Sequence, residues 1–260
     1  MEQYQYHELL RRAVEQAERE AAELVLQAHG ILAETKSGKR DVVTEYDRRV
    51  QALLIERLQE AVPDAGFFCE ERNEQDGLNA EHLFIIDPID GTMNFVRGFH
   101  HSCISVAYAE RGLVQVGVIY NPYVDEMFSA IRGKGAFLNG RPVSVTEAGL
   151  GESVVCFGSS PYNPELADRT FRLARMAFDA GLDVRREGSA ALDLCTVAAG
   201  RAGLYFELRL SLWDYAAGAL IVEEAGGKVT DLEGNRLSFR KKSSLCAVTA
   251  GVAREPYLPE

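Results

Sequence analysis

Near residue 150 the spacing of apolar residues changes, and this change restricts the folds open to the chain. Between residues 103 and 145, short β-type runs are separated by turn pairs, of which Asn139-Gly140 is typical of a tight hairpin. From residue 154 to 225, strand-like and helix-like segments alternate instead. We therefore predict an antiparallel meander followed by an α/β unit, with residues 1–148 and 149–260 as two subdomains that share a core.

The same patterns place the individual elements of both halves. The meander is expected to have strands at residues 103–108, 114–120, 127–130 and 136–145. The second half is expected to have strands at 154–158, 182–185 and 203–208, helices at 164–180, 189–199 and 212–225, and two short strands at its end.

Two amphipathic helices are expected before the meander. Apolar residues recur at spacings of three and four over residues 10–28, and Gly30 follows them closely. A second helical pattern covers residues 44–58, after a stretch at 37–40 whose composition predicts a loop. We expect the two helices to pack together on one face of a sheet.

The charge balance limits the possible partners. The formal charge is −11, from 28 basic and 39 acidic residues, which argues against a nucleic-acid partner because a phosphate backbone needs clustered Lys and Arg. A phosphorylated small molecule stays possible, because divalent cations can lie between carboxylates and phosphate. The five cysteines are scattered without a Cys-x-x-Cys pair, and no apolar run reaches the ~20 residues of a membrane span. We expect a cytoplasmic protein without a membrane partner.

The segment Asp87-Pro88-Ile89-Asp90-Gly91-Thr92 has the composition of a metal site. It follows the apolar run Leu83–Ile86, which predicts a buried strand with Asp87 at its carboxyl end. Asp90 adds a second carboxylate, Ile89 can offer its carbonyl, and Gly91 leaves room for close approach. Such hard oxygen donors suit Mg²⁺ or Mn²⁺. The alternative interpretation is an Asx turn at the end of a strand.

Other polar residues with a candidate role also have a plain structural interpretation. These interpretations are a solvated surface pair for Glu70-Glu71, a helix start for Thr44 and Asp47, a helix cap for Gly188-Ser189, and a capping box for Ser211 and Asp214. The capping box leaves Asp214 able to face a cation. Glu207, at the end of an apolar strand, is harder to explain structurally because an unpaired buried carboxylate is costly.

The segment from Asp87 to Phe95, Asp-Pro-Ile-Asp-Gly-Thr-Met-Asn-Phe, resembles a signature of the inositol monophosphatase family. The second signature of that family resembles Trp213-Asp214-Tyr215-Ala216-Ala217-Gly218, which leads into Glu224-Ala225-Gly226-Gly227. Further matches, in the order of the family, are Lys36, Asp41-Val42-Val43-Thr44, Asp47, Glu70-Glu71, Gly188-Ser189-Ala190 and Val197-Ala198-Ala199-Gly200. The resemblance therefore spans nearly the whole chain.

The resemblance implies both a fold and a set of roles. The fold is of the α/β (α+β) class, a layered αβαβα sandwich of the sugar-phosphatase type with an antiparallel N-terminal sheet and a smaller mixed C-terminal sheet. The implied metal ligands are Glu70, Asp87, Asp90, Asp214 and the Ile89 carbonyl, for two or three Mg²⁺ ions that Mn²⁺ can replace. The other implied roles are water activation by Asp47 and Thr92 with Glu71 as a further catalytic group, phosphate binding by the Gly91 and Thr92 amides, and contact with substrate hydroxyls by Glu207 and the Ala190 backbone.

The implied reaction is hydrolysis of inositol monophosphate to inositol and phosphate by a metal-activated water, in a lithium-sensitive homodimer. Rival substrates within the superfamily are fructose 1,6-bisphosphate, NADP, 3′-phosphoadenosine 5′-phosphate and histidinol phosphate. The short interval at 72–82 and the few basic residues near the substrate strand favour inositol phosphate. A regulatory binding protein that retains the fold is the alternative of another class. Cys69, where the family commonly has Gly, and His100, where Pro is common, depart from the family pattern without removing a ligand.

Overall fold

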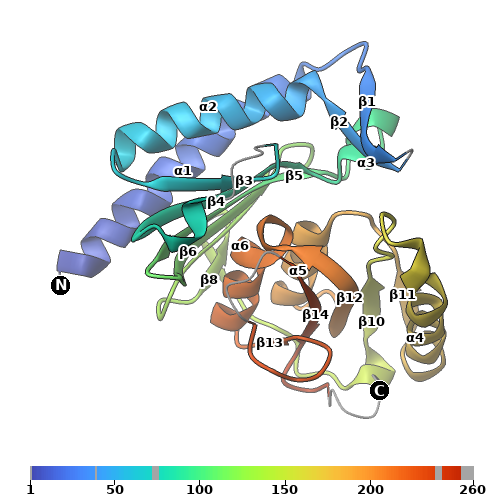
Figure 1. The fold of residues 1–260 in the computed structure, drawn as a ribbon. Coiled ribbons are helices and arrows are strands. Elements are labelled where there is room, and N and C mark those ends of the chain that lie inside the picture. Colours follow the sequence, from blue (N-terminus) through green and yellow to red (C-terminus); the bar gives the residue numbers. More distant parts are fainter. Residues whose placement is uncertain (1, 39, 72–75, 238–241, 253–260) are drawn as a thin grey trace.

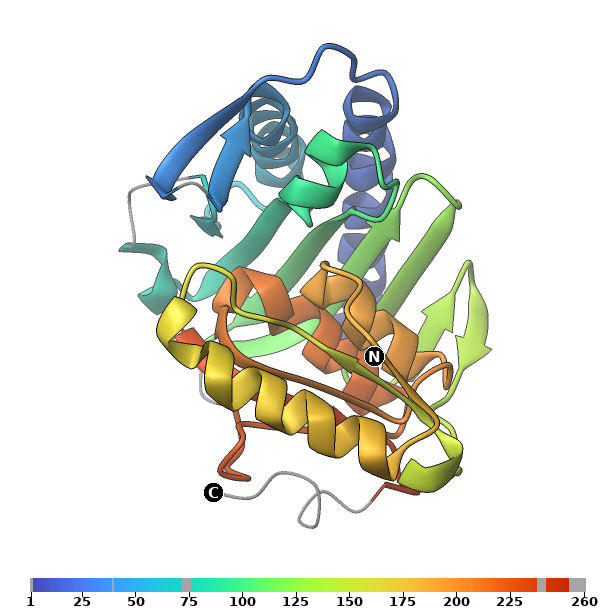
Figure 2. The same ribbon diagram turned by 90° about the vertical axis from the view of Figure 1, so that its right-hand side faces the viewer.

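The structure is a computed structural model that describes residues 2–38, 40–71, 76–237 and 242–252 (Figure 1). Helices and sheets alternate in five layers. Helices α1 (Glu2–Leu26) and α2 (Glu45–Ala61) cover one face of a seven-stranded sheet, and α5 (Ala190–Ala198) and α6 (Leu212–Glu224) pack on its other face. The inner helices also pack on a five-stranded sheet, whose outer face is covered by α4 (Ala167–Ala180). Figure 2 shows α4 lying across that outer face. The predicted αβαβα sandwich is confirmed.

The seven-stranded sheet contains the predicted meander. Its order is β3 (Gly66–Cys69), β4 (His82–Asp90), β5 (Cys103–Glu110), β6 (Leu113–Asn121), β7 (Glu126–Ile131), β8 (Ala136–Leu138) and β9 (Arg141–Val143). All neighbours are antiparallel except β3 and β4, which run parallel. At the turn between β8 and β9, Asn139 and Gly140 have φ angles of 49° and 73°. Two consecutive positive φ angles are what a two-residue hairpin turn needs, and Asn-Gly supplies them at low cost.

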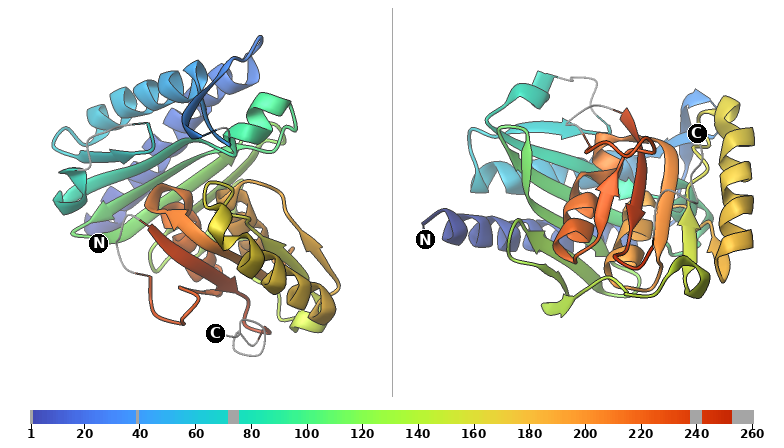
Figure 3. Two further views of the ribbon diagram at one scale, coloured as in Figure 1. Left: turned by 45° about the vertical axis from the view of Figure 1, so that its right-hand side comes forward. Right: turned by 90° about the horizontal axis from the view of Figure 1, so that it is seen from below.

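The five-stranded sheet is smaller and mixed, as predicted. Its order is β11 (Asp183–Arg185), β10 (Val154–Phe157), β12 (Leu204–Ser211), β14 (Lys242–Val248) and β13 (Lys228–Thr230). Strand β10 is parallel to β11 and β12, whereas β14 is antiparallel to β12 and β13. The views in Figure 3 show the two sheets with α5 and α6 between them.

Helix α6 is apolar around most of its circumference because it is buried between the two sheets. Its approach to the larger sheet depends on Gly117 in β6. A Cβ atom at Gly117 would lie 2.8 Å from the backbone oxygen of Ala217, too close for any side chain. This contact sets how closely α6, the helix that carries Asp214, approaches β6.

Three short strands before the meander were not predicted. Strands β1 (Ala33–Gly38) and β2 (Asp41–Thr44) form an antiparallel hairpin, so the loop predicted at 37–40 is wrong for Ser37 and Gly38, while Lys39 lies outside the described residues. The sequence of β1, AETKSG, lacks the β-branched and alternating residues that signal a strand. Strand β3 is a run of only four residues, and its parallel pairing with β4 makes the N-terminal sheet not purely antiparallel.

Strand β4 continues through Asp87 and Pro88 to Asp90, whereas the apolar pattern predicts its end at Ile86. Its pairing with β5 shifts register between Asp87 and Asp90, so the polar segment is an irregular continuation of the strand. Short 3₁₀ turns lie at Asp76–Asn79, Leu150–Glu152 and Pro164–Leu166, the last at the start of the helix expected from residue 164.

The sheets divide the chain near the boundary expected from the sequence, since β9 ends at Val143 in one sheet and β10 begins at Val154 in the other. Helices α5 and α6 pack on both sheets, so the division into subdomains at residue 148 remains a prediction. Among the described residues, no helix combines the length and the apolar character needed to cross a membrane.

Candidate metal centre and substrate cavity

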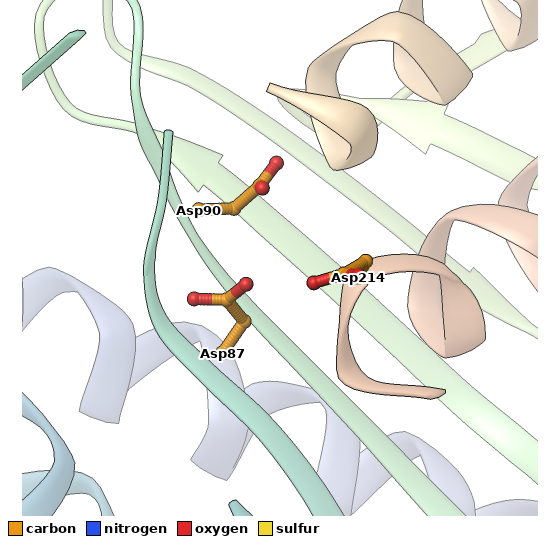
Figure 4. A group of neighbouring side chains, drawn as sticks. All are labelled: Asp87, Asp90 and Asp214. Atoms are coloured by element: carbon orange, nitrogen blue, oxygen red, sulfur yellow. The ribbon is translucent and has the colours of Figure 1, made fainter. Parts of the chain in front are cut away.

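Three carboxylates meet where the two sheets approach each other (Figure 4). One oxygen from each of Asp87, Asp90 and Asp214 lies within 4.8 Å of the other two. Residues three apart on a regular strand point to opposite faces. The register shift between Asp87 and Asp90 removes that alternation, so both side chains lie on the side of β4 that faces Asp214 at the start of α6. The irregular end of β4 thereby supplies two of the three carboxylates in the cluster.

Burial and mutual repulsion disfavour the charged forms of these carboxylates. Burial is the main cause that raises the pKa of Asp87 well above its usual range, and the charges of Glu70, Asp90 and Asp214 add to it. Burial and the charge of Asp90 likewise raise the pKa of Asp214. Burial raises the pKa of Asp90 to about 6, against hydrogen bonds that favour its charged form. A hard divalent cation relieves this repulsion and accepts such oxygen donors, so the residues fit Mg²⁺ or Mn²⁺.

Neighbouring groups hold Asp90 and Asp214 in place. The Ser189 hydroxyl donates to Asp90 Oδ2 at 2.5 Å, and the Ala191 amide donates to the same oxygen at 2.8 Å. The Ser211 amide donates to Asp214 Oδ2 at 2.6 Å within a capping box. The capping interpretation of Ser211 and Asp214 is therefore correct, and Asp214 faces the cluster as well.

Glu70 and Glu71 do not form a solvated surface pair. Lys36 Nζ donates to Glu70 at 3.0 Å and also to Glu71, and the two side chains are 23% and 8% exposed. Glu70 is not one of the three clustered carboxylates, but its charge acts on Asp87 and Asp214. Burial is the main cause that raises the pKa of Glu70 to about 7, and the Lys36 charge opposes it. Glu70 thus lies at the edge of the cluster, held by a lysine.

Asp47 and Thr92 are joined by a hydrogen bond between two helices. The Thr92 hydroxyl lies 3.2 Å from Asp47 Oδ1 and 3.1 Å from the Ile89 carbonyl oxygen, and it can donate to one of them at a time. Asp47 Oδ2 accepts from the Thr44 amide at 2.8 Å and from the Thr44 hydroxyl at 2.5 Å. The helix-start interpretation of Thr44 and Asp47 is correct, since they form a capping box. Burial raises the pKa of Asp47, which these hydrogen bonds partly oppose.

Gly91 lies in a position that only glycine fits. Its φ angle is 87°, and a Cβ atom would lie 3.1 Å from the His101 carbonyl oxygen and 3.2 Å from that of Gly188. Gly91 precedes helix α3 (Thr92–Arg97). The Gly91 amide hydrogen-bonds the Asp90 carboxylate here, so phosphate binding by this amide stays a prediction.

A cavity of about 610 Å³ opens onto the cluster. It is lined by nine of the predicted site residues, namely Glu70, Asp87, Ile89, Asp90, Gly91, Thr92, Ala190, Glu207 and Asp214. Asp47 and Glu71 do not line it; Asp47 reaches it through Thr92, and Glu71 through the shared Lys36.

Glu207 is buried but hydrogen-bonded, which explains how the fold tolerates it. One oxygen accepts from the Ser160 amide at 2.7 Å and the other from the Tyr205 hydroxyl at 2.9 Å. A Cβ atom at Gly158 would lie 1.8 Å from Glu207 Oε2, so this glycine makes room for the carboxylate. Glu207 therefore presents a fixed acceptor on the cavity wall.

Several residues of the cavity were missed by the sequence analysis. Asp193 is 2% exposed, and its Oδ1 has no hydrogen-bond partner among the described residues. An acidic residue in the otherwise apolar helix α5 was the available signal for it. Arg186 and Arg209 also line the cavity, and no local pattern distinguishes them from surface arginines.

The two departures from the family pattern replace no carboxylate of the cluster. Cys69 is 2% exposed within the core under α1 and α2, where solvent oxidants have little access. His100 has a φ angle of 56° and stacks on Tyr123 with 4.9 Å between ring centroids, so it is a packing feature of the loop after α3.

A sequence model described as the inositol monophosphatase family matches residues 5–257. The chain is 38% identical over 222 residues to the "Putative Nus factor SuhB" of Neisseria meningitidis serogroup B, covering 84% of this chain and 85% of the relative. It is 38% identical over 215 residues to the "Inositol-1-monophosphatase" of Rhizobium meliloti, covering 80% and 79%.

Two solved structures give the same picture of the fold. The extragenic suppressor protein suhB from Bartonella henselae superposes with a TM-score of 0.86 at 38% identity, covering 94% of each chain. A crystal structure of an IMPase/NADP phosphatase complexed with Mg²⁺ and phosphate superposes with a TM-score of 0.84 at 26% identity, covering 98% of this chain and 94% of that chain.

Proposed function

Because the chain belongs to the inositol monophosphatase family, we propose that it is a Mg²⁺-dependent phosphomonoesterase that hydrolyses inositol monophosphate to inositol and phosphate. The observation that carries the proposal is a group of three carboxylates, two buried and one half-buried, beside a buried Asp–Thr pair at one cavity. Neither a helix cap nor an Asx turn needs such a group. The structure with Mg²⁺ and phosphate, from a protein of the same fold, supports the choice of metal and of phosphate as a product.

Asp87, Asp90 and Asp214 would hold the metal, with Glu70 and the Ile89 carbonyl as further donors for a total of two or three ions. Bound Mg²⁺ would supply positive charge for the phosphate oxygens and lower the pKa of a coordinated water. Mn²⁺, which prefers the same donors, is expected to substitute. The residues around the cluster must then orient the nucleophile and bind the ester.

Asp47 and Thr92 would position and deprotonate the attacking water. The Thr92 hydroxyl donates to Asp47 Oδ1 or to the Ile89 carbonyl, so its own oxygen is free to accept a hydrogen bond from water. Asp47 is buried without a cationic partner at ion-pair distance among the described residues, and its raised pKa makes it a better proton acceptor. Glu71 would tune this pair through the Lys36 contact that it shares with Glu70.

The opposite wall of the cavity would bind the alcohol half of the substrate. Glu207 offers carboxylate acceptors held by Ser160 and Tyr205, and the Ala190 backbone lies at the start of α5 beside it. Acceptors in fixed positions suit the hydroxyls of a polyol. The amides of Gly91 and Thr92 would contact the phosphate between the two walls.

A homodimer, sensitivity to Li⁺ and a cytoplasmic location complete the proposal and rest on the family resemblance. The alternative of another class is a regulatory role, which is favoured by the relative named a putative Nus factor. The intact carboxylate cluster favours catalysis, and it does not prevent the protein from having a regulatory role as well.

The test is phosphate release by purified protein from inositol, fructose, NADP, 3′-phosphoadenosine 5′-phosphate and histidinol esters. We expect turnover of myo-inositol 1-phosphate with Mg²⁺ or Mn²⁺, none with EDTA, and inhibition by Li⁺ in the millimolar range. Inactivity on every ester with either metal would rule out the enzyme. Activity that is insensitive to Li⁺ would count against the inositol-phosphate subtype.

A further inference from the structure

Asp193 is a buried acidic residue without a role in the proposed reaction. It is the only charged residue of helix α5, and it is 2% exposed. It lines the cavity that opens onto the metal cluster. One of its two carboxyl oxygens, Oδ1, has no hydrogen-bond partner among the described residues. Since buried polar atoms in folded proteins nearly always have a partner, this oxygen requires an explanation.

The surroundings of Asp193 favour an uncharged carboxyl group. Burial raises the pKa of Asp193 well above its usual range, and the charges of Glu207, Asp90 and Glu187 add to this effect. The thiol of Cys156 hydrogen-bonds the carboxyl group, but a thiol is only a weak donor. A neutral carboxyl group donates one hydrogen bond and accepts others, so a hydroxyl group, which does the same, is a matching partner.

Helix α5 presents Asp193 on the same face as Ala190. Residues three apart on a helix are neighbours on its surface, and both of these residues line the cavity. The start of the helix is fixed relative to the metal cluster, because its N-cap residue Ser189 donates to Asp90 at 2.5 Å. An alcohol whose hydroxyl contacts the Ala190 backbone therefore lies along the face of α5 that carries Asp193.

Strand β12 brings Glu207 to the same part of the cavity. The charge of Glu207 is the strongest of the charges that act on Asp193, so the two carboxyl groups are close. Tyr205 lies two residues before Glu207 on the same face of the strand, and the charges of both carboxyl groups act on its hydroxyl. Both oxygens of Glu207 already accept a hydrogen bond, whereas Asp193 Oδ1 accepts none among the described residues. Asp193 is therefore the carboxyl group with more unused hydrogen-bonding capacity.

Two carboxyl groups on separate elements suit an alcohol with several hydroxyl groups. A polyol carries hydroxyls on neighbouring carbon atoms, so one of them can bind Glu207 while another reaches Asp193. Rotation about the Cβ–Cγ bond of Asp193 exchanges its two oxygens, so either of them can face the cavity. An alcohol without the second hydroxyl would leave this buried carboxyl group unpaired, and a site of this kind rejects such an analogue.

We propose that Asp193 is a specificity-determining residue that hydrogen-bonds a second hydroxyl of the substrate alcohol, beside the hydroxyl bound by Glu207. This inference rests on the proposed function, because the metal cluster must first place the phosphate. It names the preferred substrate class as phosphate monoesters of polyols that carry hydroxyl groups on at least two further carbon atoms. Esters of simpler alcohols would reach the metal cluster but would leave Asp193 without a partner.

The test uses analogues of myo-inositol 1-phosphate that each lack one ring hydroxyl. We expect the wild type to have a kcat/KM at least about tenfold lower for two or more of them than for the parent ester, mainly through KM. Asp193→Leu should treat one of these analogues like the parent ester, and Glu207→Met should do so for a different one. Asp193→Asn, which keeps an acceptor and a donor, should discriminate as the wild type does. Asp168→Leu is the matched control, because Asp168 is exposed on α4 and does not line the cavity.

Calorimetry with Ca²⁺ in place of Mg²⁺ keeps the two proposals separable, because it measures binding apart from hydrolysis. If no ester is hydrolysed but Asp193→Leu abolishes the discrimination against one analogue in binding, the role of Asp193 stands and the proposed function fails. If inositol phosphate is hydrolysed but Asp193→Leu loses the same factor for every ester, or loses nothing, Asp193 serves only the fold or a bound water, and its proposal fails alone. Asp193→Ala replaces Asp193→Leu if the leucine variant does not fold.

Discussion

At the scale of single residues, the site depends on carboxylates that the fold buries before any cation neutralises them. Asp87, Asp90 and Asp214 carry pKa values raised first by burial. Specific hydrogen bonds support them. Ser189 donates to Asp90 at 2.5 Å, and the Thr92 hydroxyl lies within hydrogen-bond distance of both Asp47 and the Ile89 carbonyl oxygen. The resemblance to family motifs identified the carboxylates. From the sequence, Ser189 could be predicted only as a helix cap, because its hydrogen bond to Asp90 depends on the tertiary structure.

Thr92→Val tests the assigned water-orienting pair. Valine keeps the shape of threonine but removes the hydroxyl, so the water loses its acceptor and Asp47 loses a donor. We expect kcat to fall about 100-fold, within the range of a lost acid–base contact, with less change in KM. Steady-state kinetics would measure this, with exposed Thr35→Val as control. A kcat within about threefold of the wild type would remove Thr92 from the mechanism.

The raised pKa values predict how pH affects the stability of the metal-free protein. A carboxyl with a folded pKa above its unfolded value contributes no penalty below the unfolded pKa, and its full penalty above the folded pKa. Glu70 and Asp90, with folded pKa values of about 7 and about 6, place the loss of stability between roughly pH 4 and 8.

Thermal unfolding with and without Mg²⁺ measures this effect. In EDTA we expect Tm to fall as the pH is raised from about 5.5 to about 8, equivalent to about 1–3 kcal/mol. Saturating Mg²⁺ should reduce the fall, because the cation favours the charged carboxylates. The same fall in Tm with and without Mg²⁺ would contradict the assignment of the cluster as the metal site.

At the scale of elements, the helices and the meander strands follow from local patterns, whereas the irregular strands do not. The helix over residues 44–58 and the Asn139-Gly140 hairpin were predicted from spacing and turn chemistry alone. The β1–β2 hairpin was missed because its first strand has no strand-like pattern. The continuation of β4 through Asp87 to Asp90 was missed because Asp-Pro usually ends a strand, and only the register shift with β5 accommodates it.

Gly117→Ala tests the seating of helix α6. The added methyl group would lie 2.8 Å from the Ala217 backbone oxygen, so α6 and Asp214 must move away from β6. We expect a loss of about 1–3 kcal/mol in unfolding free energy and weaker Mg²⁺ binding. Denaturant unfolding and calorimetry would measure both, with Gly149→Ala as control, since its Cβ would meet its nearest atom at 3.7 Å. Mg²⁺ affinity unchanged in Gly117→Ala would show that this contact does not position Asp214.

At the scale of the whole molecule, the site lies where the two sheets approach, and each half contributes what the other lacks. The seven-stranded sheet supplies Asp87 and Asp90, and the C-terminal half supplies Asp214 and Glu207. The order of the layers followed from the family resemblance and is confirmed. The place of Arg186 and Arg209 in the cavity did not, because no local pattern marks either residue; only the fold reveals that they share a cavity.

The central claim is that Asp90 belongs to a metal site on which hydrolysis depends. The most direct measurement is Mg²⁺ binding by calorimetry together with phosphate release from myo-inositol 1-phosphate, for wild type and Asp90→Asn. Asp64→Asn, at an exposed aspartate outside the cavity lining, is the matched control. We expect Asp90→Asn to lose both Mg²⁺ binding and at least about 99% of the activity, and Asp64→Asn to keep both. Wild-type activity or Mg²⁺ affinity in Asp90→Asn would contradict the account.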